Sequence, residues 1–160
     1  MEKGILRVTG LAVFRSLIIL PIVLITGCVA NGKSACAVTE PVWDKPPEDS
    51  AVSSTPEDGY YFVNKDHSIW ASAWWTGQGD NYLNASEEGI KVGWFRPSGA
   101  ELEITGRRID AEVAPLEADI PCCYPTRFQA TGLYFPAGGC WEITEKAEDS
   151  LLTFVLWVEP

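Results

Sequence analysis

The sequence predicts an all-β domain, an antiparallel sandwich of about seven strands over residues 59–160. Short runs of aromatic and β-branched residues begin at Gly59, and several alternate with polar residues at a period of two. Clusters of Gly, Pro, Asn and Asp separate these runs at the spacing of turns. No stretch after residue 28 shows the 3.6-residue periodicity of an amphipathic helix of ten or more residues. Many short strands joined by turns are typical of two packed sheets.

Two pairs of strands are expected in the first half of this domain. The run YYFVNKDHSIWASAWW, residues 60–75, is aromatic and β-branched around a polar turn, which predicts a hairpin or two strands. In IKVGWFRPSGAELEITG, residues 90–106, apolar residues occupy every second position on both sides of a Pro-Ser-Gly turn. That pattern predicts a second hairpin. A polar loop, residues 77–89, connects the two pairs.

Three further strands are expected in the second half. An acidic stretch interrupted by proline, residues 109–121, is interpreted as a loop, with a short helix as the alternative. RFQATGLYFP (127–136), CWEIT (140–144) and LTFVLWV (152–158) follow as strands, because each is rich in aromatic and β-branched residues.

The last strands also carry a family resemblance. The segment LYFPAGGCWEITEKAEDSLLTFVLWVEP, residues 133–160, resembles the end of an immunoglobulin-like domain, in which a Pro-Gly corner leads into a strand with a buried Cys and an aromatic residue. Together with residues 91–106, it is similar to a recurrent ending in bacterial secreted and lipoprotein domains. The resemblance implies an immunoglobulin-like sandwich, although the early-strand Cys followed by Trp of antibody-type domains is missing. It implies no activity.

The N-terminus has the layout of an export signal. Lys3, Arg7 and Arg15 give a positive lead, and the apolar run LIILPIVLI, residues 17–25, follows. That run is about half of the roughly 20 residues that a spanning helix needs, and Pro21 disfavours a long helix. Small residues end the run, which completes the pattern of a signal peptide over residues 1–27.

Cys28 follows this segment directly, and ITGC, residues 25–28, resembles the lipobox of bacterial lipoproteins. The resemblance implies diacylglycerol on the Cys28 sulfur, cleavage after Gly27, and acylation of the new amino terminus with a chain such as palmitate. Two or more acyl chains form a stable anchor, at about 0.8 kcal/mol per buried methylene. An ordinary cleaved signal with a chance cysteine, and an uncleaved anchor helix, are the alternatives.

This lipid would place the mature chain outside the cytoplasm, on the cell membrane or on an outer membrane. Val29 is not the Asp that is linked to inner-membrane retention of lipoproteins, so an outer-membrane address fits. Removal of residues 1–27 takes away three positive charges and one negative charge, which moves the formal net charge from −10 to −12. We expect such a domain to be repelled by anionic lipid and to stand off the membrane.

Residues 28–58 are expected to be a tether. They are rich in Pro, Ser, Glu and Asp and poor in large apolar residues, so they bury too little surface to offset the entropy of ordering. Cys36 and Trp43 are the exceptions, and either is a candidate to dock back onto the domain.

The charge balance argues against nucleic acid as a partner. Asp and Glu number 22 against 12 Lys and Arg, and the basic residues are not clustered, whereas nucleic-acid binding proteins grip phosphates with clustered basic residues. The expected partners are the membrane, through the N-terminal lipid, and a protein or glycan ligand.

Five cysteines in one short chain favour an oxidising compartment. With Cys28 lipidated, Cys36, Cys122, Cys123 and Cys140 remain for two disulfides. The simplest arrangement joins Cys122 or Cys123 to Cys140 and the other to Cys36, because adjacent strand residues face opposite sides. The alternative is a vicinal bond between Cys122 and Cys123, with Cys36 paired to Cys140.

Sites for catalysis, metals or cofactors are not expected. His67 is the single histidine and lies in a predicted surface turn next to Asp66, and the chain has no Gly-x-Ser-x-Gly nucleophile motif. The cysteines lack zinc spacing, and residues 77–89 offer oxygen ligands for calcium without the EF-hand pattern. A small hydrolase or metal-dependent enzyme that uses carboxylates and His67 remains the alternative function.

Seven tryptophans in 160 residues are the most informative clue to function. Trp74 and Trp75 are neighbours, so on a strand they would face opposite sides, and at least one would lie on an outer surface. An exposed aromatic ring on a sheet can stack on a sugar or anchor a protein partner. The sequence therefore predicts a non-catalytic, membrane-tethered binding or accessory module.

Overall fold

The computed structural model describes residues 32–49, 56–76, 83–122 and 124–160. The expected signal peptide, the lipidation site Cys28, and Cys123 lie outside these ranges. Within them, no helix is both long enough and apolar enough to span a membrane. The helical element described there is a single 3₁₀ turn, η1 (Lys33–Ala35).

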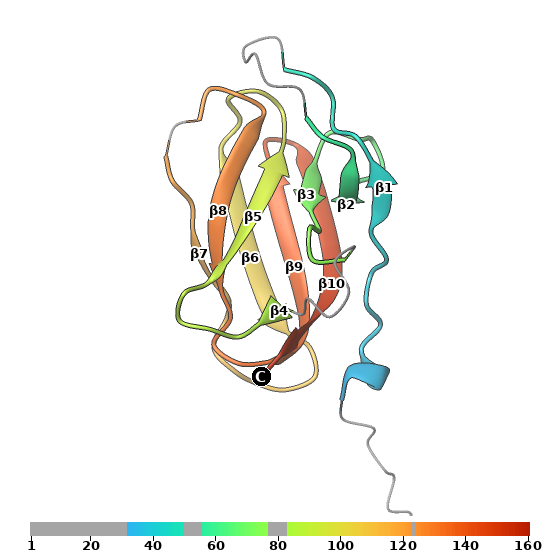
Figure 1. Ribbon diagram of the computed structural model, residues 1–160. Helices are drawn as coiled ribbons and strands as arrows, with labels where there is room; N and C mark the ends of the chain where they lie inside the picture. The colour runs from blue at the N-terminus through green and yellow to red at the C-terminus, as the bar shows by residue number, and fades with distance from the viewer. Residues whose placement is uncertain (1–31, 50–55, 77–82, 123) are drawn as a thin grey trace, which may run out of the picture.

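Two sheets pack face to face and confirm the all-β sandwich (Figure 1). The six-stranded sheet has, in order, β1 (Val42–Asp44), β2 (Gly59–Val63), β3 (Trp70–Ser72), β5 (Ile90–Phe95), β8 (Phe128–Tyr134) and β7 (Glu117–Asp119). The four-stranded sheet has β4 (Leu83–Asn84), β10 (Ser150–Glu159), β9 (Gly139–Ala147) and β6 (Leu102–Arg108). Pairing is antiparallel throughout except between β4 and β10. The described residues thus form ten strands where about seven were expected, and the extra ones, β1, β4 and β7, are short segments of predicted loop or tether.

The period-two patterns identify the buried face of each strand correctly. Ile90, Val92 and Trp94 on β5 are buried, as are Leu102 and Ile104 on β6. The hairpin predicted for this pair is wrong, because β5 pairs with β3 and β8 whereas β6 pairs with β9. The turn between them crosses from one sheet to the other. The expected hairpin β2–β3 forms, and β9 and β10 form another.

The segment before β2, residues 32–49, lies against the sandwich and is here called the docked segment. Thr39 is held twice by β10, because its N–H donates to the Val155 carbonyl at 2.8 Å and its Oγ1 accepts from the Val155 N–H at 2.9 Å. Further along, β1 forms the edge of the six-stranded sheet, and the Arg127 N–H donates to the Asp49 carboxylate at 2.6 Å. Much of the described part of residues 28–58 therefore belongs to the folded domain.

A disulfide joins Cys36 to Cys140, whose Cα atoms are 5.5 Å apart. The preferred arrangement, in which Cys140 bonds Cys122 or Cys123, is therefore wrong. The simplest arrangement assumed that Cys122 and Cys123 lay on a strand, whereas Cys122 lies in a bend between β7 and β8. The Cys36–Cys140 bond is the one that the alternative arrangement contained. Cys122 is itself disulfide-bonded.

A small polar group interrupts the apolar core. Arg96, which follows β5, is 2% exposed, and its guanidinium donates to the carbonyls of Tyr124 and Thr126 and, at 2.6 Å, to Gln129 Oε1. Burial lowers the pKa of Arg96, while the carboxyl of Glu145 on β9 acts in the opposite direction. The guanidinium fixes the segment that leads into β8 by bonding its backbone directly.

Candidate functional site

Two tryptophans are conspicuously exposed among the described residues. Trp43 on β1 is 64% exposed, and Trp74, after β3, is 46% exposed. Trp75 is half-buried and packs against the core with its ring 6.3 Å from that of Phe62. Trp74 and Trp75 lie in a turn and not on a strand. The Thr76 N–H donates to the Ala73 carbonyl at 2.9 Å and closes this turn. The turn gives the two rings different environments.

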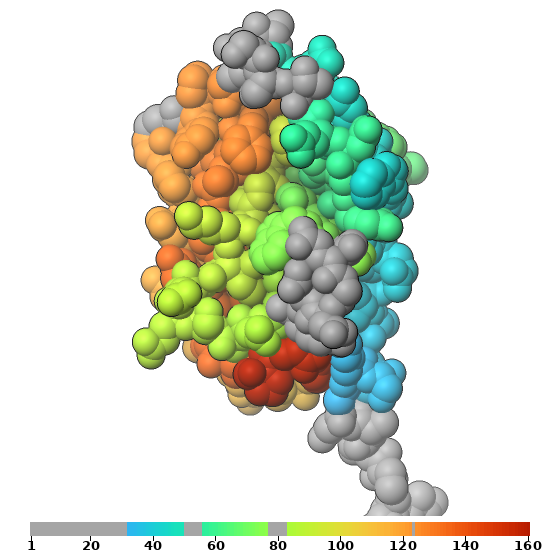
Figure 2. All heavy atoms as spheres, in the orientation of Figure 1, coloured from blue at the N-terminus to red at the C-terminus, as the bar shows by residue number. Residues whose placement is uncertain are grey.

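These two exposed rings border a shallow groove of about 530 Å³, here called the aromatic groove. It lies at the β1–β2 margin of the six-stranded sheet, and the teal and green atoms of these strands are seen at the upper right of Figure 2. The residues that line it are Trp43, Glu57, Asp58, Gly59, Tyr60, Tyr61, Ser72 and Trp74.

Backbone pairing positions the walls of the aromatic groove. In the β1–β2 ladder, Trp43 lies opposite Tyr60, and their rings meet edge to face at 5.1 Å and 83°. The Trp74 indole N–H donates to the Lys91 carbonyl on β5 at 3.0 Å. Both exposed indoles are therefore held in place by neighbouring strands, which lowers the entropy lost when a ligand packs on them.

Tyr61 lies deepest among the lining aromatic residues. It is 7% exposed, and its hydroxyl donates to the Glu57 carbonyl at 3.0 Å. Gly59 allows the ring to lie this close to the backbone, since a Cβ there would be 3.3 Å from the Tyr61 ring. On its other side the ring is 6.0 Å from Phe95, which is 5.2 Å from Phe128.

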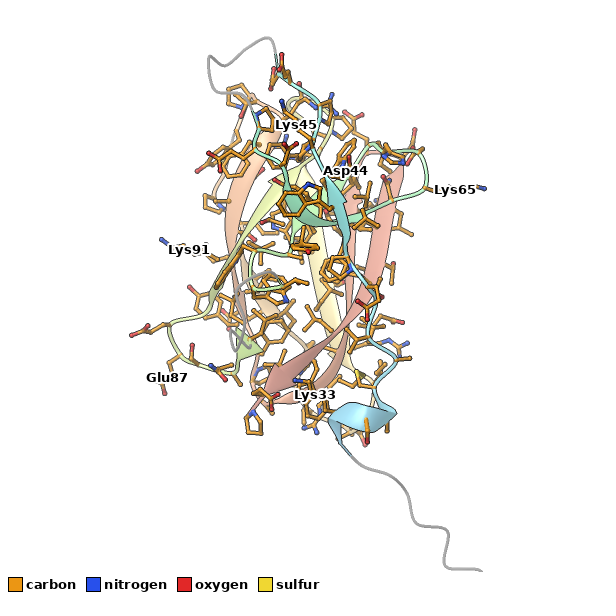
Figure 3. All side chains as sticks on the ribbon, turned by 45° about the vertical axis from the view of Figure 1, so that its right-hand side comes forward. Lys33, Asp44, Lys45, Lys65, Glu87 and Lys91 are labelled. Atoms are coloured by element: carbon orange, nitrogen blue, oxygen red, sulfur yellow. A yellow bond between two sulfur atoms is a disulfide. The ribbon has the colours of Figure 1, made fainter. Side chains whose placement is uncertain are left out.

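The aromatic groove lies in a negative electrostatic field. The pKa of Tyr61 is raised, first by burial and then by the carboxylates of Glu57, Asp58 and Asp44. Lys65 and Lys91 extend away from the molecule on opposite sides (Figure 3).

His67 lies outside the aromatic groove. Its side chain is 64% exposed, and Nδ1 is 3.7 Å from Asp44 Oδ2, an oxygen that also accepts from the Trp70 indole at 3.2 Å. Asp66, the sequence neighbour, instead contacts the Ser68 hydroxyl at 3.0 Å. With φ at 54°, His67 occupies the left-handed turn region, as expected for a surface turn residue.

The cysteines and the polar loop are the groups in the sequence that could supply metal ligands. In the described ranges, no three side chains of His, Cys, Asp or Glu are grouped so that they can hold a metal ion. The run that offers oxygen ligands for calcium, residues 77–89, lies partly outside those ranges.

Sequence reasoning found Trp74 but not the rest of the groove. Trp43, Glu57 and Asp58 were assigned to the tether, because that stretch has a linker composition. Trp43 was nonetheless expected as a candidate to dock back onto the domain, and its place on β1, opposite Tyr60 of β2, confirms this.

The groove combines aromatic faces, a hydroxyl and carboxylates, which can pack on and hydrogen-bond a ligand group.

Comparison with known proteins found no matching family model, no matching curated protein and no matching solved structure.

Proposed function

We propose that this chain is a non-catalytic binding module, held outside the cell membrane by lipid on Cys28, and that the aromatic groove is its binding surface. The observation that carries the proposal is the pair of exposed but immobilised indoles, Trp43 and Trp74. A soluble domain ordinarily buries such rings, and anchoring aromatic residues dominate the energetics of binding surfaces.

The anchoring part of the proposal rests on the lipobox and on the disulfide chemistry. The Cys36–Cys140 bond is of the kind that persists in oxidising compartments. An acylated Cys28 would hold the domain at such a surface with no spanning helix.

Ligand titration of the full-length protein in a neutral detergent tests the proposal. The indole N–H signals of Trp43 and Trp74, assigned by substitution, are followed in two-dimensional NMR spectra during titration with neutral cell-wall oligosaccharides and with short peptides. We expect at least one class to shift these signals, and Trp43→Ala and Trp74→Ala to weaken its binding about fivefold or more each.

Phe128→Ala is the matched control, because Phe128 is an exposed aromatic residue of the same sheet that does not line the groove. It should leave affinity unchanged. If no ligand in the panel moves the two indole signals, or if the control loses as much affinity as the two groove variants, the groove is not the binding surface.

A further inference from the structure

We propose that the aromatic groove recognises a cationic side chain, lysine or arginine, presented by a protein partner. This inference rests on the proposed function and names the ligand class for that same groove. It is drawn from the coincidence of exposed indole faces with exposed carboxylates at one place on the surface.

The aromatic part of the groove suits a cation. Trp43 meets Tyr60 edge to face, with the ring planes at 83°, and remains 64% exposed, so its indole is open to a ligand. A cation within about 6 Å of an aromatic face is attracted by the ring quadrupole, most strongly by tryptophan. The anchored Trp74 supplies a further indole to the same lining.

The carboxylates of the groove also favour a positively charged ligand. Glu57 and Asp58 are exposed lining residues, and after burial they and Asp44 contribute to the raised pKa of the Tyr61 hydroxyl. The nearby Lys45 is directed to Glu48, with its Nζ 4.0 Å from the carboxylate. Among the described residues, Glu57 and Asp58 belong to no ion pair, which leaves their carboxylates available to an incoming cation.

A cationic side chain uses the groove more fully than a neutral sugar does. A sugar ring would stack on one indole and accept or donate hydrogen bonds, but it gains nothing from the negative potential. A lysine or arginine uses both features, and its long stem can reach into a shallow groove from a partner's surface. The net charge of −10 also favours encounter with a basic partner.

Four probes separate these chemistries on the full-length protein in neutral detergent. They are a blocked peptide with one central lysine, the same peptide with acetyl-lysine, tetramethylammonium chloride, and chitotriose. We expect the lysine peptide and tetramethylammonium to shift the Trp43 and Trp74 indole signals. The acetyl-lysine peptide should bind at least about threefold more weakly, and raising salt from about 0.05 M to about 0.5 M should weaken the lysine peptide.

Charge-neutralising variants supply the residue-level test. Glu57→Gln combined with Asp58→Asn should weaken the lysine peptide about threefold or more, while leaving the circular dichroism spectrum unchanged. Glu87→Gln is the matched control, because Glu87 is an exposed carboxylate that lies away from Asp44 (Figure 3). It should change nothing.

The outcomes distinguish this inference from the proposed function. Binding of chitotriose that the double variant does not affect, with no binding of the cations, overturns the cation inference and leaves the binding module standing. Equal binding of the lysine and acetyl-lysine peptides also overturns it. No response of either indole to any probe or to the wider panel contradicts both proposals.

Discussion

Glu145 is a carboxyl group in the apolar space between the two sheets. It is 0% exposed, its register partners are the buried Ile104 and Leu152, and neither carboxyl oxygen has a hydrogen-bond partner among the described residues. Burial raises its pKa to about 9, although Arg96 opposes the shift. Glu145 is therefore a neutral acid in the folded protein at neutral pH.

This state has a consequence for stability that grows with pH. The folded protein keeps the Glu145 proton up to about pH 9, whereas the unfolded chain loses it around the ordinary value of 4.5. Between these values unfolding releases a proton, so the free energy of unfolding falls as pH rises, by up to about 1.4 kcal/mol per pH unit. Glu145→Gln removes the titration and should flatten this slope between about pH 5 and pH 9.

Denaturant unfolding across that range measures the slope. Glu103→Gln, which alters an exposed carboxylate on the neighbouring strand, should keep the slope of the wild-type protein. A Glu145→Gln variant whose slope equals that of the wild type would mean that Glu145 is ionised in the fold or titrates normally.

At the scale of the element, the Cys36–Cys140 bond fixes the docked segment. It joins residues 104 positions apart, and closing a loop of about 100 residues stabilises a fold by about 4–5 kcal/mol in the chain-entropy model. Cys36→Ser and Cys140→Ser should each lower the free energy of unfolding by about 3–5 kcal/mol, as measured in guanidinium. The β1–β2 pairing and the Thr39–Val155 hydrogen bonds remain in either variant.

Cys28→Ala is the control for this change, because Cys28 is expected to lie outside the folded domain. Its free energy of unfolding should match that of the wild type. Loss of stability in Cys28→Ala alone, with none in Cys36→Ser, would contradict the account of the docked segment.

The elements also show what the sequence could and could not predict. Alternation on β5 and β6 predicted the buried faces, because side-chain period depends on the local backbone alone. It could not predict their partners, since strands in different sheets carry the same period; that is why the β5–β6 hairpin was wrong. Glu145 was missed although it occupies the inward register of Trp141 and Ile143, because a carboxylate is normally assigned to the outside.

The sequence predicted only part of the aromatic groove, because local patterns do not reveal long-range contacts. Adjacency of Trp74 and Trp75 was enough to expect one exposed ring. Trp43 is placed at the groove by the Cys36–Cys140 disulfide and by the three-residue strand β1. Both depend on long-range contacts, which composition does not reveal. Short edge strands such as β1 form because a partner strand is present, and their own residues carry little signal.

For the whole molecule, the decisive prediction concerns Cys28. Radiolabelled palmitate should enter the wild-type protein in bacterial cells and be absent from Cys28→Ala, because the lipobox resemblance assigns acylation to that residue. Cys36→Ser is the control and should remain labelled. Equal labelling of wild type and Cys28→Ala, or none in the wild type, would remove the membrane address from the proposal.

The docked segment also limits how far a domain lipidated at Cys28 could lie from the membrane surface. Eight residue steps separate Cys28 from the disulfide at Cys36, and a fully extended chain covers about 28 Å over that length. Lys33 lies at one end of the sandwich and Asp44 towards the other (Figure 3). Held within that distance of the lipid headgroups at its Cys36 end, the domain would present Trp43, the neighbour of Asp44 on β1, to the aqueous side. Basic ligands dissolved or displayed beyond the envelope surface would then have access, and those embedded in the same bilayer would not.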